Sequence, residues 1–365
     1  GLRWLDAFDR RLALRGLGWP AENLRRKNFF RAQSAAAGRV SDHVRLLARC
    51  PAGVHVAFFT DSAELSVRLE AADSLQMGHM PATGMAGAEL YFREEGRWYP
   101  MATARPSVTE PKFEANLFRD SSRRLREYRL YLPLYKPLVA LALGFERGAV
   151  VRPARAPRGS KPWIFYGTSI TQGGCASTAG SDFVSMVGRA LDAETINFGF
   201  SGNGKGEPAM ARLIRQIDAE MYVLDFFANT DGQSLDSVLA EFLRILREKR
   251  PRTPVVILGM PALNQILWNE DVRTAWADKR DTAMRVYLRA KDAGDRHLHF
   301  IDGQAVLPAG IAGAYVDGVH PTSHGFALMA ERLAPLLREI LLGENLSVAR
   351  RDAAGTRRRR KPRER

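Results

Sequence analysis

The fold is decided by Tyr166-Gly167-Thr168-Ser169-Ile170-Thr171-Gln172-Gly173, which follows the apolar run Pro162-Trp163-Ile164-Phe165. The apolar run predicts a buried parallel strand, and a helix is predicted from about Ser181 to Leu191. Open α/β sheets build their sites where such strands end. The glycines on both sides allow a sharp turn that leaves the Ser169 hydroxyl uncovered. Taken alone, however, the stretch is more typical of a Ser/Thr turn that caps a helix.

The same strand–helix pattern repeats after residue 160. Strands are predicted at 163–167, 195–200, 221–227, 254–259 and 297–302, and helices at 181–191, 207–218, 234–249, about 272–293 and 323–342. Five strands that alternate with helices predict a parallel sheet covered on both faces. Right-handed crossovers then give a doubly wound, flavodoxin-like sheet in which the carboxyl ends of the strands share one rim.

The first half of the chain has a different texture. Residues 1–48 show only partial helical spacing, and short runs rich in β-branched and aromatic residues follow at 54–59, 64–69, 89–93, 128–132 and 138–143. Such runs predict an antiparallel, jelly-roll-like β-sandwich. Pro, Gly and charged residues at 152–162 mark a linker. We therefore expect a sandwich domain over 1–155, an α/β domain over 160–344 and a tail over 345–365.

The net charge of +14 is unevenly distributed, because residues 350–365 hold nine Lys or Arg against two acidic residues. This tail is expected to be disordered and to attract polyanions without sequence preference. No aromatic residue lies among its arginines, so specific nucleic-acid binding is not expected. The lack of an apolar run of about 18 residues argues against a membrane span.

The two cysteines and the amino terminus say little about metal sites, disulfides or cellular location. Cys50 and Cys175 form neither a disulfide framework nor a zinc pattern, and a small buried thiol is expected at Cys175. Gly1 does not open a signal peptide. The location is therefore undetermined: the protein is cytoplasmic, or exported if a leader preceded residue 1. The oligomeric state is not predicted.

Candidate site residues follow the other strands of the predicted sheet. Gly202, in the glycine-rich run 197–206 after strand two, can donate a backbone N–H to an oxyanion, whereas the run fits neither nucleotide-binding motif. Asn229, after strand three, is either a second donor or a turn cap. Asp317 lies three residues before His320, a spacing at which a carboxylate can orient an imidazole. No acidic or cysteine partner makes a zinc set of His320 and His324.

The stretches that contain Ser169, Gly202, Asn229 and His320 follow one another in the same order as the signature blocks of the SGNH (GDSL-like) hydrolases. The resemblance to this family covers residues 160–342. Residues 167–171 resemble the Ser block, 197–202 the Gly block and 317–321 the His block, whereas Phe227 and Thr230 depart from the usual neighbours of the Asn. Residues 87–91 (Gly-Ala-Glu-Leu-Tyr) resemble the Gly-x-Asp-Leu-Tyr motif of a sandwich that precedes one branch of bacterial SGNH esterases. Glu89 replaces the usual Asp of that motif.

The resemblance implies a carbohydrate acetylesterase that removes short acyl groups, O-acetyl first, from substrates such as acetylated xylan or small esters. The nucleophile would be Ser169, with His320 as the base and Asp317 as its orienting partner. Ser169, Gly202 and Asn229 would form the oxyanion hole. No cofactor or metal is required. Trp268 and Trp276 are expected to serve packing rather than sugar binding.

Three rivals remain open at this stage. A thioesterase or lipase-like acyl hydrolase would need an apolar acyl tunnel. A glycan-binding protein would carry an inert hydrolase half, and a polyanion-binding protein would use the arginine tail.

Overall fold

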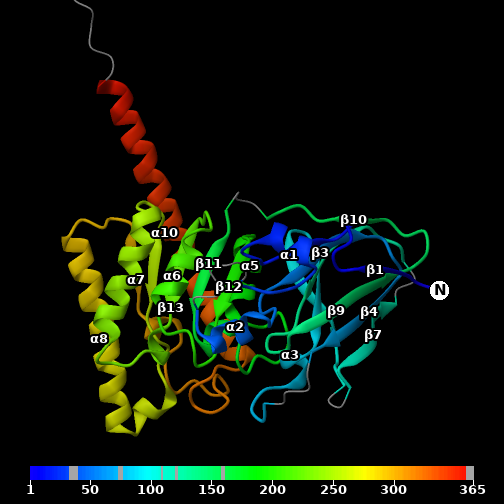
Figure 1. Cartoon of the computed structure of the whole chain (residues 1–365), viewed down its shortest axis with the longest axis horizontal. Helices are drawn as coiled ribbons and strands as arrows, with labels where there is room; N and C mark the ends of the chain where they lie inside the picture. The colour runs from blue at the N-terminus through cyan, green and yellow to red at the C-terminus, as the bar shows by residue number, and fades with distance from the viewer. Residues whose placement is uncertain (33–39, 73–76, 108–109, 120–121, 158–160, 359–365) are drawn as a thin grey trace, which may run out of the picture.

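A five-stranded parallel sheet forms the centre of the carboxyl-terminal half in the computed structural model (Figure 1), which describes residues 1–32, 40–72, 77–107, 110–119, 122–157 and 161–358. The strand order is β12-β11-β13-β14-β15, the flavodoxin-like order that the sequence predicts. The strands are β11 (Trp163–Gly167), β12 (Thr195–Gly199), β13 (Met221–Asp225), β14 (Val255–Leu258) and β15 (Leu298–Ile301).

Helices cover both faces of this sheet. One face packs against α6 (Pro208–Ile214), α7 (Leu235–Lys249) and α8 (Glu270–Asp292), and the other against α5 (Phe183–Leu191) and α10 (Ser323–Arg358). Alternate residues of β11 serve the two cores. Ile164 and Tyr166 lie in the first, where the ring of Tyr166 stacks on Phe242 with centroids 5.1 Å apart. Trp163 and Phe165 lie in the second. Burial on both sides explains the unbroken apolar run in the sequence.

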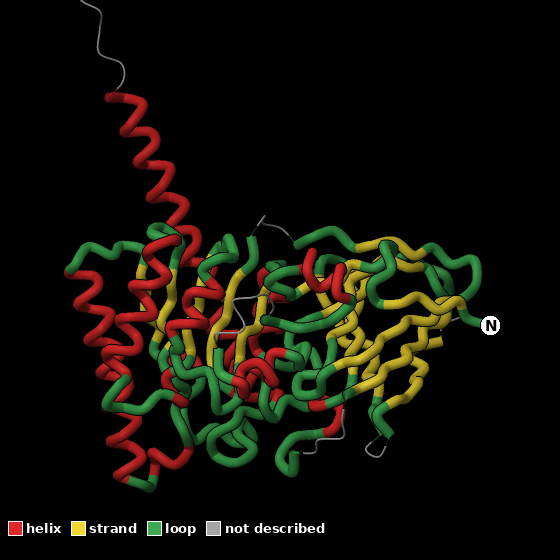
Figure 2. The backbone as a smooth tube through the Cα atoms, in the orientation of Figure 1, coloured by secondary structure: helices red, strands yellow, loops and turns green. Residues whose placement is uncertain are grey.

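The amino-terminal half contains two antiparallel sheets around their own core (Figure 2). The sheet orders are β1-β9-β4-β7 and β10-β3-β8-β5-β6, with β2 paired to β3. The five predicted strands are present, and five others were not predicted. The strands are β1 (Arg3–Asp6), β2 (Ala13–Arg15), β3 (His55–Thr60), β4 (Glu64–Ala71), β5 (Ala88–Glu94), β6 (Arg97–Ala104), β7 (Lys112–Arg119), β8 (Arg126–Tyr131), β9 (Leu138–Phe145) and β10 (Val151–Pro153).

Short helices connect these elements. They are α1 (Pro20–Arg26), α2 (Asp42–Ala48), α3 (Ala82–Met85), α4 (Ser169–Gln172) and α9 (Gly303–Val306), with 3₁₀ turns η2 (Phe227–Asn229) and η3 (Asn264–Leu267). The partial helical spacing before residue 48 therefore corresponds to two short helices and two short strands.

The two halves share packing despite the linker between them. Val44 and Ala48 of α2 belong to the same apolar core as Phe198 and Phe200 at the end of β12. The fully buried guanidinium of Arg31 lies 4.9 Å from the ring centroid of Phe200. Its N–H groups donate to four backbone carbonyls, two in each half: Leu47 (2.8 Å), Cys50 (2.6 Å), Asn197 (2.9 Å) and Gly199 (2.7 Å).

The motif at residues 87–91 lies at this junction. Glu89, buried in β5, accepts a 2.8 Å hydrogen bond from the N–H of Gly180 in the other half. The ring of Tyr91 lies 3.9 Å from the guanidinium of Arg189 on α5. A Cβ at Gly87 would lie 2.5 Å from the Thr83 carbonyl oxygen, so only glycine fits there. The motif therefore joins the sandwich to the α/β half.

The carboxyl-terminal end departs from the expected disordered tail at 345–365. Helix α10 continues through this boundary to Arg358, while 359–365 lie outside the described residues. Alanine and arginine, which recur in this segment, are strong helix formers. Residues 158–160 of the predicted linker also lie outside the described part.

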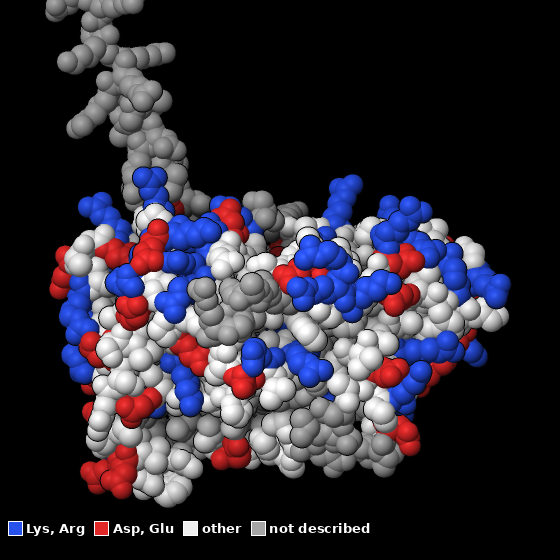
Figure 3. Space-filling view, in the orientation of Figure 1, with Lys and Arg blue, Asp and Glu red and all other residues white. Residues whose placement is uncertain are grey.

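On the face shown in Figure 3, basic and acidic side chains are interspersed rather than segregated. Among the described helices, none combines the length and apolarity that crossing a membrane requires.

Candidate active site

Ser169 begins helix α4, directly after the end of β11. Thr168 caps this helix, because its hydroxyl accepts a hydrogen bond from the N–H of Ile170 at 3.2 Å. The turn needs glycine at 167, where a Cβ would lie 2.1 Å from Oγ1 of Thr171. The first N–H groups of a helix have no partner inside the helix. Ser169 therefore presents a hydroxyl and a backbone donor at the rim of the sheet.

Asp317, His320 and Ser169 form one continuous chain of hydrogen bonds. Nε2 of His320 lies 2.9 Å from Oγ of Ser169, and Nδ1 lies 2.7 Å from Oδ2 of Asp317. The other carboxylate oxygen, Oδ1, accepts the backbone N–H of His320 at 2.7 Å. The carboxylate thus fixes the proton on Nδ1 and leaves Nε2 to accept a proton from Ser169.

The charge state of Asp317 is set by these hydrogen bonds. Partial burial raises its pKa, but donation from the backbone and ring of His320 and from the N–H of Val319 outweighs burial and lowers the pKa to about 2. The carboxylate is therefore ionised at every pH near neutrality, and it can stabilise a positive charge on His320.

Gly202 and Asn229 line the same cavity as Ser169 and His320, which has a volume of about 580 Å³. Gly202 has φ +67°, a left-handed backbone that favours glycine. Asn229 ends the turn η2, four residues after β13. Its Nδ2 is buried, and within the described part of the chain it has no hydrogen-bond partner. A buried amide donor without a partner is costly unless a ligand satisfies it.

Asn197 holds the loops of this rim together. Its Nδ2 donates to the carbonyl of Thr171 at 2.6 Å, and its Oδ1 accepts from the N–H of Gly199 at 2.8 Å. The start of the predicted Gly block thereby ties the end of β12 to helix α4. His324, by contrast, is exposed at the start of α10 and does not line the cavity.

Two charged residues of the cavity were not predicted. Asp225 ends β13 and accepts a 2.9 Å hydrogen bond from Oγ1 of Thr171. Burial raises the pKa of Asp225 to about 7, against the opposing effect of that hydrogen bond. The sequence could have indicated Asp225 as a site residue, because it is a carboxylate within the apolar run 221–227. Lys279 donates to the carbonyls of Phe227 and Ala228, and burial lowers its pKa. Nothing in the sequence distinguishes Lys279 from a surface lysine of α8.

Part of the cavity lining, here called the apolar wall, consists of apolar side chains that include Met260, Leu263, Val272 and Trp276. Trp276 is largely buried, and its indole N–H donates to the carbonyl of Pro261 at 3.1 Å. The tryptophan expected only to pack therefore also lines the cavity. Trp268 is 74% exposed and belongs to neither core.

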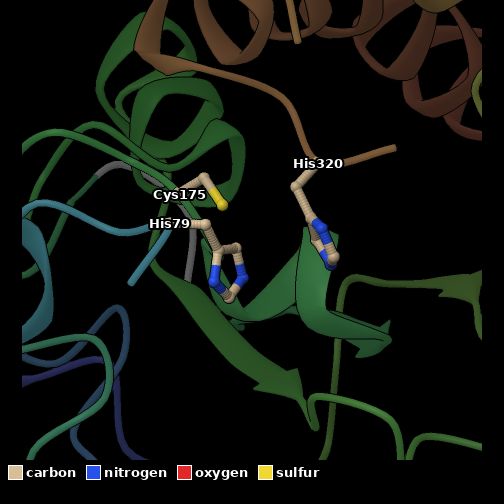
Figure 4. Close-up of side chains that lie close together, drawn as sticks. All are labelled: His79, Cys175 and His320. Atoms are coloured by element: carbon tan, nitrogen blue, oxygen red, sulfur yellow. The ribbon is translucent and has the colours of Figure 1, made fainter. Parts of the chain in front are cut away.

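His79 and Cys175 lie on one side of His320, as Figure 4 shows. His79 comes from the amino-terminal half, and its ring centroid is 5.6 Å from that of His320. Cys175 is buried, as expected, in the turn after α4. The three residues offer two nitrogens and a sulfur within 4.8 Å of one another. The contribution of His79 was not predicted, because it depends on how the two halves pack.

Family models match nearly the whole chain. Residues 160–338 match the GDSL-like lipase/acylhydrolase family, and residues 2–151 match the N-terminus of SGNH-hydrolase-type esterases. No curated protein matches the sequence.

Solved structures show the same architecture. A protein described as a GDSL-like lipase from Bacteroides ovatus is 26% identical, with a TM-score of 0.86 over 93% of this chain and 98% of its own. A salicylyl-acyltransferase from a tetracycline biosynthetic pathway is 22% identical, with a TM-score of 0.71 over 92% and 97%. A family two carbohydrate esterase from Cellvibrio japonicus is 12% identical, with a TM-score of 0.60 over 93% and 98%. The chain therefore carries a domain of the GDSL-like (SGNH) acylhydrolase family over residues 160–338, preceded by the N-terminal domain of SGNH-hydrolase-type esterases, and it is an esterase.

Proposed function

We propose that this chain is a serine esterase that removes short acyl groups, O-acetyl first, from carbohydrates such as acetylated xylan through an acyl-enzyme. The observation that carries the proposal is the hydrogen-bonded chain Ser169–His320–Asp317, with its 2.9 and 2.7 Å contacts. A serine hydroxyl is a weak nucleophile until an adjacent base takes its proton. His320 is within reach of that proton, and Asp317 keeps its ring in the required tautomer.

Acylation begins when Oγ of Ser169 attacks the ester carbonyl carbon. The Ser169 proton moves to Nε2 of His320, and the carbonyl oxygen becomes an oxyanion. The C–O bond to the alcohol then breaks, and the imidazolium returns its proton to the leaving sugar oxygen. A water molecule next gives a proton to Nε2 and attacks the acyl carbon of the acyl-enzyme. The bond from that carbon to Oγ then breaks, the acid leaves, and the proton on Nε2 returns to Oγ of Ser169. The ionised Asp317 stabilises the imidazolium in both halves of the reaction.

Three donors are proposed for the oxyanion: the backbone N–H groups of Ser169 and Gly202, and Nδ2 of Asn229. The support for Asn229 is its buried amide, which lacks a partner within the described residues and lines the same cavity as Ser169. Donors held in place before the reaction stabilise developing charge without reorganisation.

The carbohydrate part of the proposal is carried over from the resemblance to bacterial carbohydrate acetylesterases. Family two carbohydrate esterases share this fold, and one from Clostridium thermocellum was solved in complex with cellohexaose. The test is acetate release from acetylated xylan by the wild type and by Ser169→Ala. Release by both proteins would overturn the catalytic assignment, and release by neither would overturn the substrate assignment.

The apolar wall favours a second candidate, an acyl hydrolase for longer or aromatic acyl groups. A cavity of about 580 Å³ lies in the range of pockets for whole small-molecule ligands, about 300–1,000 Å³. This exceeds the needs of an acetyl group. Rates on p-nitrophenyl esters from acetate to octanoate separate the two candidates, since an acetylesterase slows as the chain lengthens.

A cavity-filling variant makes this test specific. Ala275→Phe adds a ring at a residue that lines the cavity and is none of the proposed catalytic groups. If acyl groups occupy the wall, octanoate hydrolysis should fall at least tenfold in this variant while acetate hydrolysis stays within about twofold. Equal losses on both esters would place the acyl group elsewhere.

A further inference from the structure

We propose that His79, Cys175 and His320 form a binding site for Zn²⁺, and that the bound cation switches the esterase off. The first part rests on the donor cluster alone, and the inhibition rests on the function proposed above. The donors are two imidazole nitrogens and one thiol sulfur that lie within 4.8 Å of one another. Imidazole and thiolate are the ligands that Zn²⁺ prefers, and three protein ligands leave a fourth position for water.

His320 is already oriented as a metal ligand. Zinc-bound histidines commonly donate their second ring N–H to a carboxylate, which fixes the tautomer and strengthens the ligand. Nδ1 of His320 has that partner in Asp317 at 2.7 Å, so Nε2 carries the lone pair, which faces Oγ of Ser169 at 2.9 Å. The arrangement that prepares Nε2 to accept a proton from Ser169 equally prepares it to bind a cation. The cation and Ser169 therefore compete for one nitrogen.

The distances require only a small adjustment. Zn–N and Zn–S bonds of about 2.0–2.3 Å place tetrahedral ligand atoms about 3.3–3.8 Å apart. Ligand atoms now up to 4.8 Å apart must close by about 1 Å. His79 can make this movement because it is exposed, whereas the other two residues are buried or hydrogen-bonded. Its exposure also opens the cluster to solvent, so a cation can enter beside it.

Metal binding would remove the proton of the Cys175 thiol and occupy the nitrogen that acts as the base. The Sγ–H bond of Cys175 breaks, a sulfur–metal bond forms, and the thiol proton passes to solvent. Burial and the nearby charge of Asp317 raise the pKa of Cys175 to about 12, so without metal the group remains a thiol. Coordination deprotonates a thiol outright. Once Nε2 is bound to the cation it cannot take the Ser169 proton, and acylation stops.

Binding is tested first without catalysis, in full-length Ser169→Ala protein, which keeps all three ligands. Calorimetry with Zn²⁺ should give one site per chain, and Co²⁺ should give a thiolate-to-cobalt charge-transfer absorption. Cys175→Ala in this background should abolish the absorption, and His79→Ala should weaken Zn²⁺ binding at least tenfold. The matched controls are Cys50→Ala and His43→Ala, which should leave both signals unchanged.

Inhibition is then measured with active protein on a p-nitrophenyl ester. Zn²⁺ should inhibit the wild type and a chelator should restore activity. His79→Ala and Cys175→Ala should keep the metal-free rate within about twofold and need at least tenfold more Zn²⁺ for the same inhibition. Absence of binding in the Ser169→Ala protein, or equal inhibition of wild type and Cys175→Ala, would overturn the proposal. If the wild type proves to have no esterase activity, the calorimetry still decides the metal site.

Discussion

The two halves of the chain contribute to the cavity region in opposite ways. In the α/β half, Ser169 follows β11 and His320 lies in the loop before α10, and both bring a reactive group to the rim of the parallel sheet. In the sandwich half, Arg31 and Glu89 hold backbone atoms instead: Arg31 binds carbonyls at the end of β12, and Glu89 binds the N–H of Gly180. One half therefore supplies chemistry, and most of what the other supplies is position.

This contrast predicts that the largest losses of activity come from the rim. Ser169→Ala should lower kcat at least about 10⁴-fold, because removal of a nucleophile leaves only binding and oxyanion stabilisation. His320→Ala should do the same. The matched control is His324→Ala, an exposed histidine four residues away, which should stay within twofold. The measurement is the initial rate on p-nitrophenyl acetate. A comparable loss of activity in His324→Ala would contradict the assignment of His320 as the catalytic base.

The next largest effect is expected at Asn229. Asn229→Ala should lower kcat about 10²–10³-fold with little change in KM, because an oxyanion donor acts mainly in the transition state. Asn229→Asp should be worse, since its carboxylate would face the developing negative charge. Thermal melts check that both variants fold. A variant in which KM rises while kcat is kept would assign Asn229 to substrate binding.

A stability loss rather than a loss of chemistry is expected in the sandwich half. Arg31→Met removes the donors to four backbone carbonyls and should lower the free energy of unfolding by about 2–3 kcal/mol. Arg26→Met is the control, because the Arg26 side chain is 60% exposed and its single ion pair with Glu22 is worth less than about 1 kcal/mol. Urea titrations compare the two. If Arg31→Met loses no more unfolding free energy than the control, the hydrogen bonds of Arg31 do not stabilise the contact between the two halves.

The smallest effect, taken over a single pH unit, is expected within the rim itself, at a residue outside the proposed chemistry. Asp225 keeps its proton to about pH 7 when folded, whereas the unfolded chain loses it near 3.8. From about pH 4 to 7 the folded state therefore binds more protons, and the unfolding free energy falls as pH rises, by about 1.4 kcal/mol per pH unit. Asp225→Asn should lack this slope. Denaturant unfolding at pH 5, 6 and 7 measures it, and parallel slopes would contradict the burial effect.

The sequence predicted what depends on local pattern. Strand ends of a parallel sheet meet at one rim, so the order of Ser169, Gly202, Asn229 and His320 was enough to place them around one site. His79 and Arg31 could not be predicted, because their positions depend on how two non-adjacent segments pack. The helical extension of α10 to Arg358 was not predicted, because the dense positive charge of this segment is typical of disorder, whereas its alanine and arginine residues also favour a helix.

The core shared across the linker has a consequence for how this protein can change over generations. The linker is a boundary in sequence, yet Val44, Ala48 and Arg31 cover apolar side chains and carbonyls of the other half. A gene rearrangement that separated the halves there would leave that surface uncovered, with buried groups exposed and unpaired. We therefore expect descendants of this chain to inherit, duplicate or lose both halves together, and to gain new substrates through the loops at the rim.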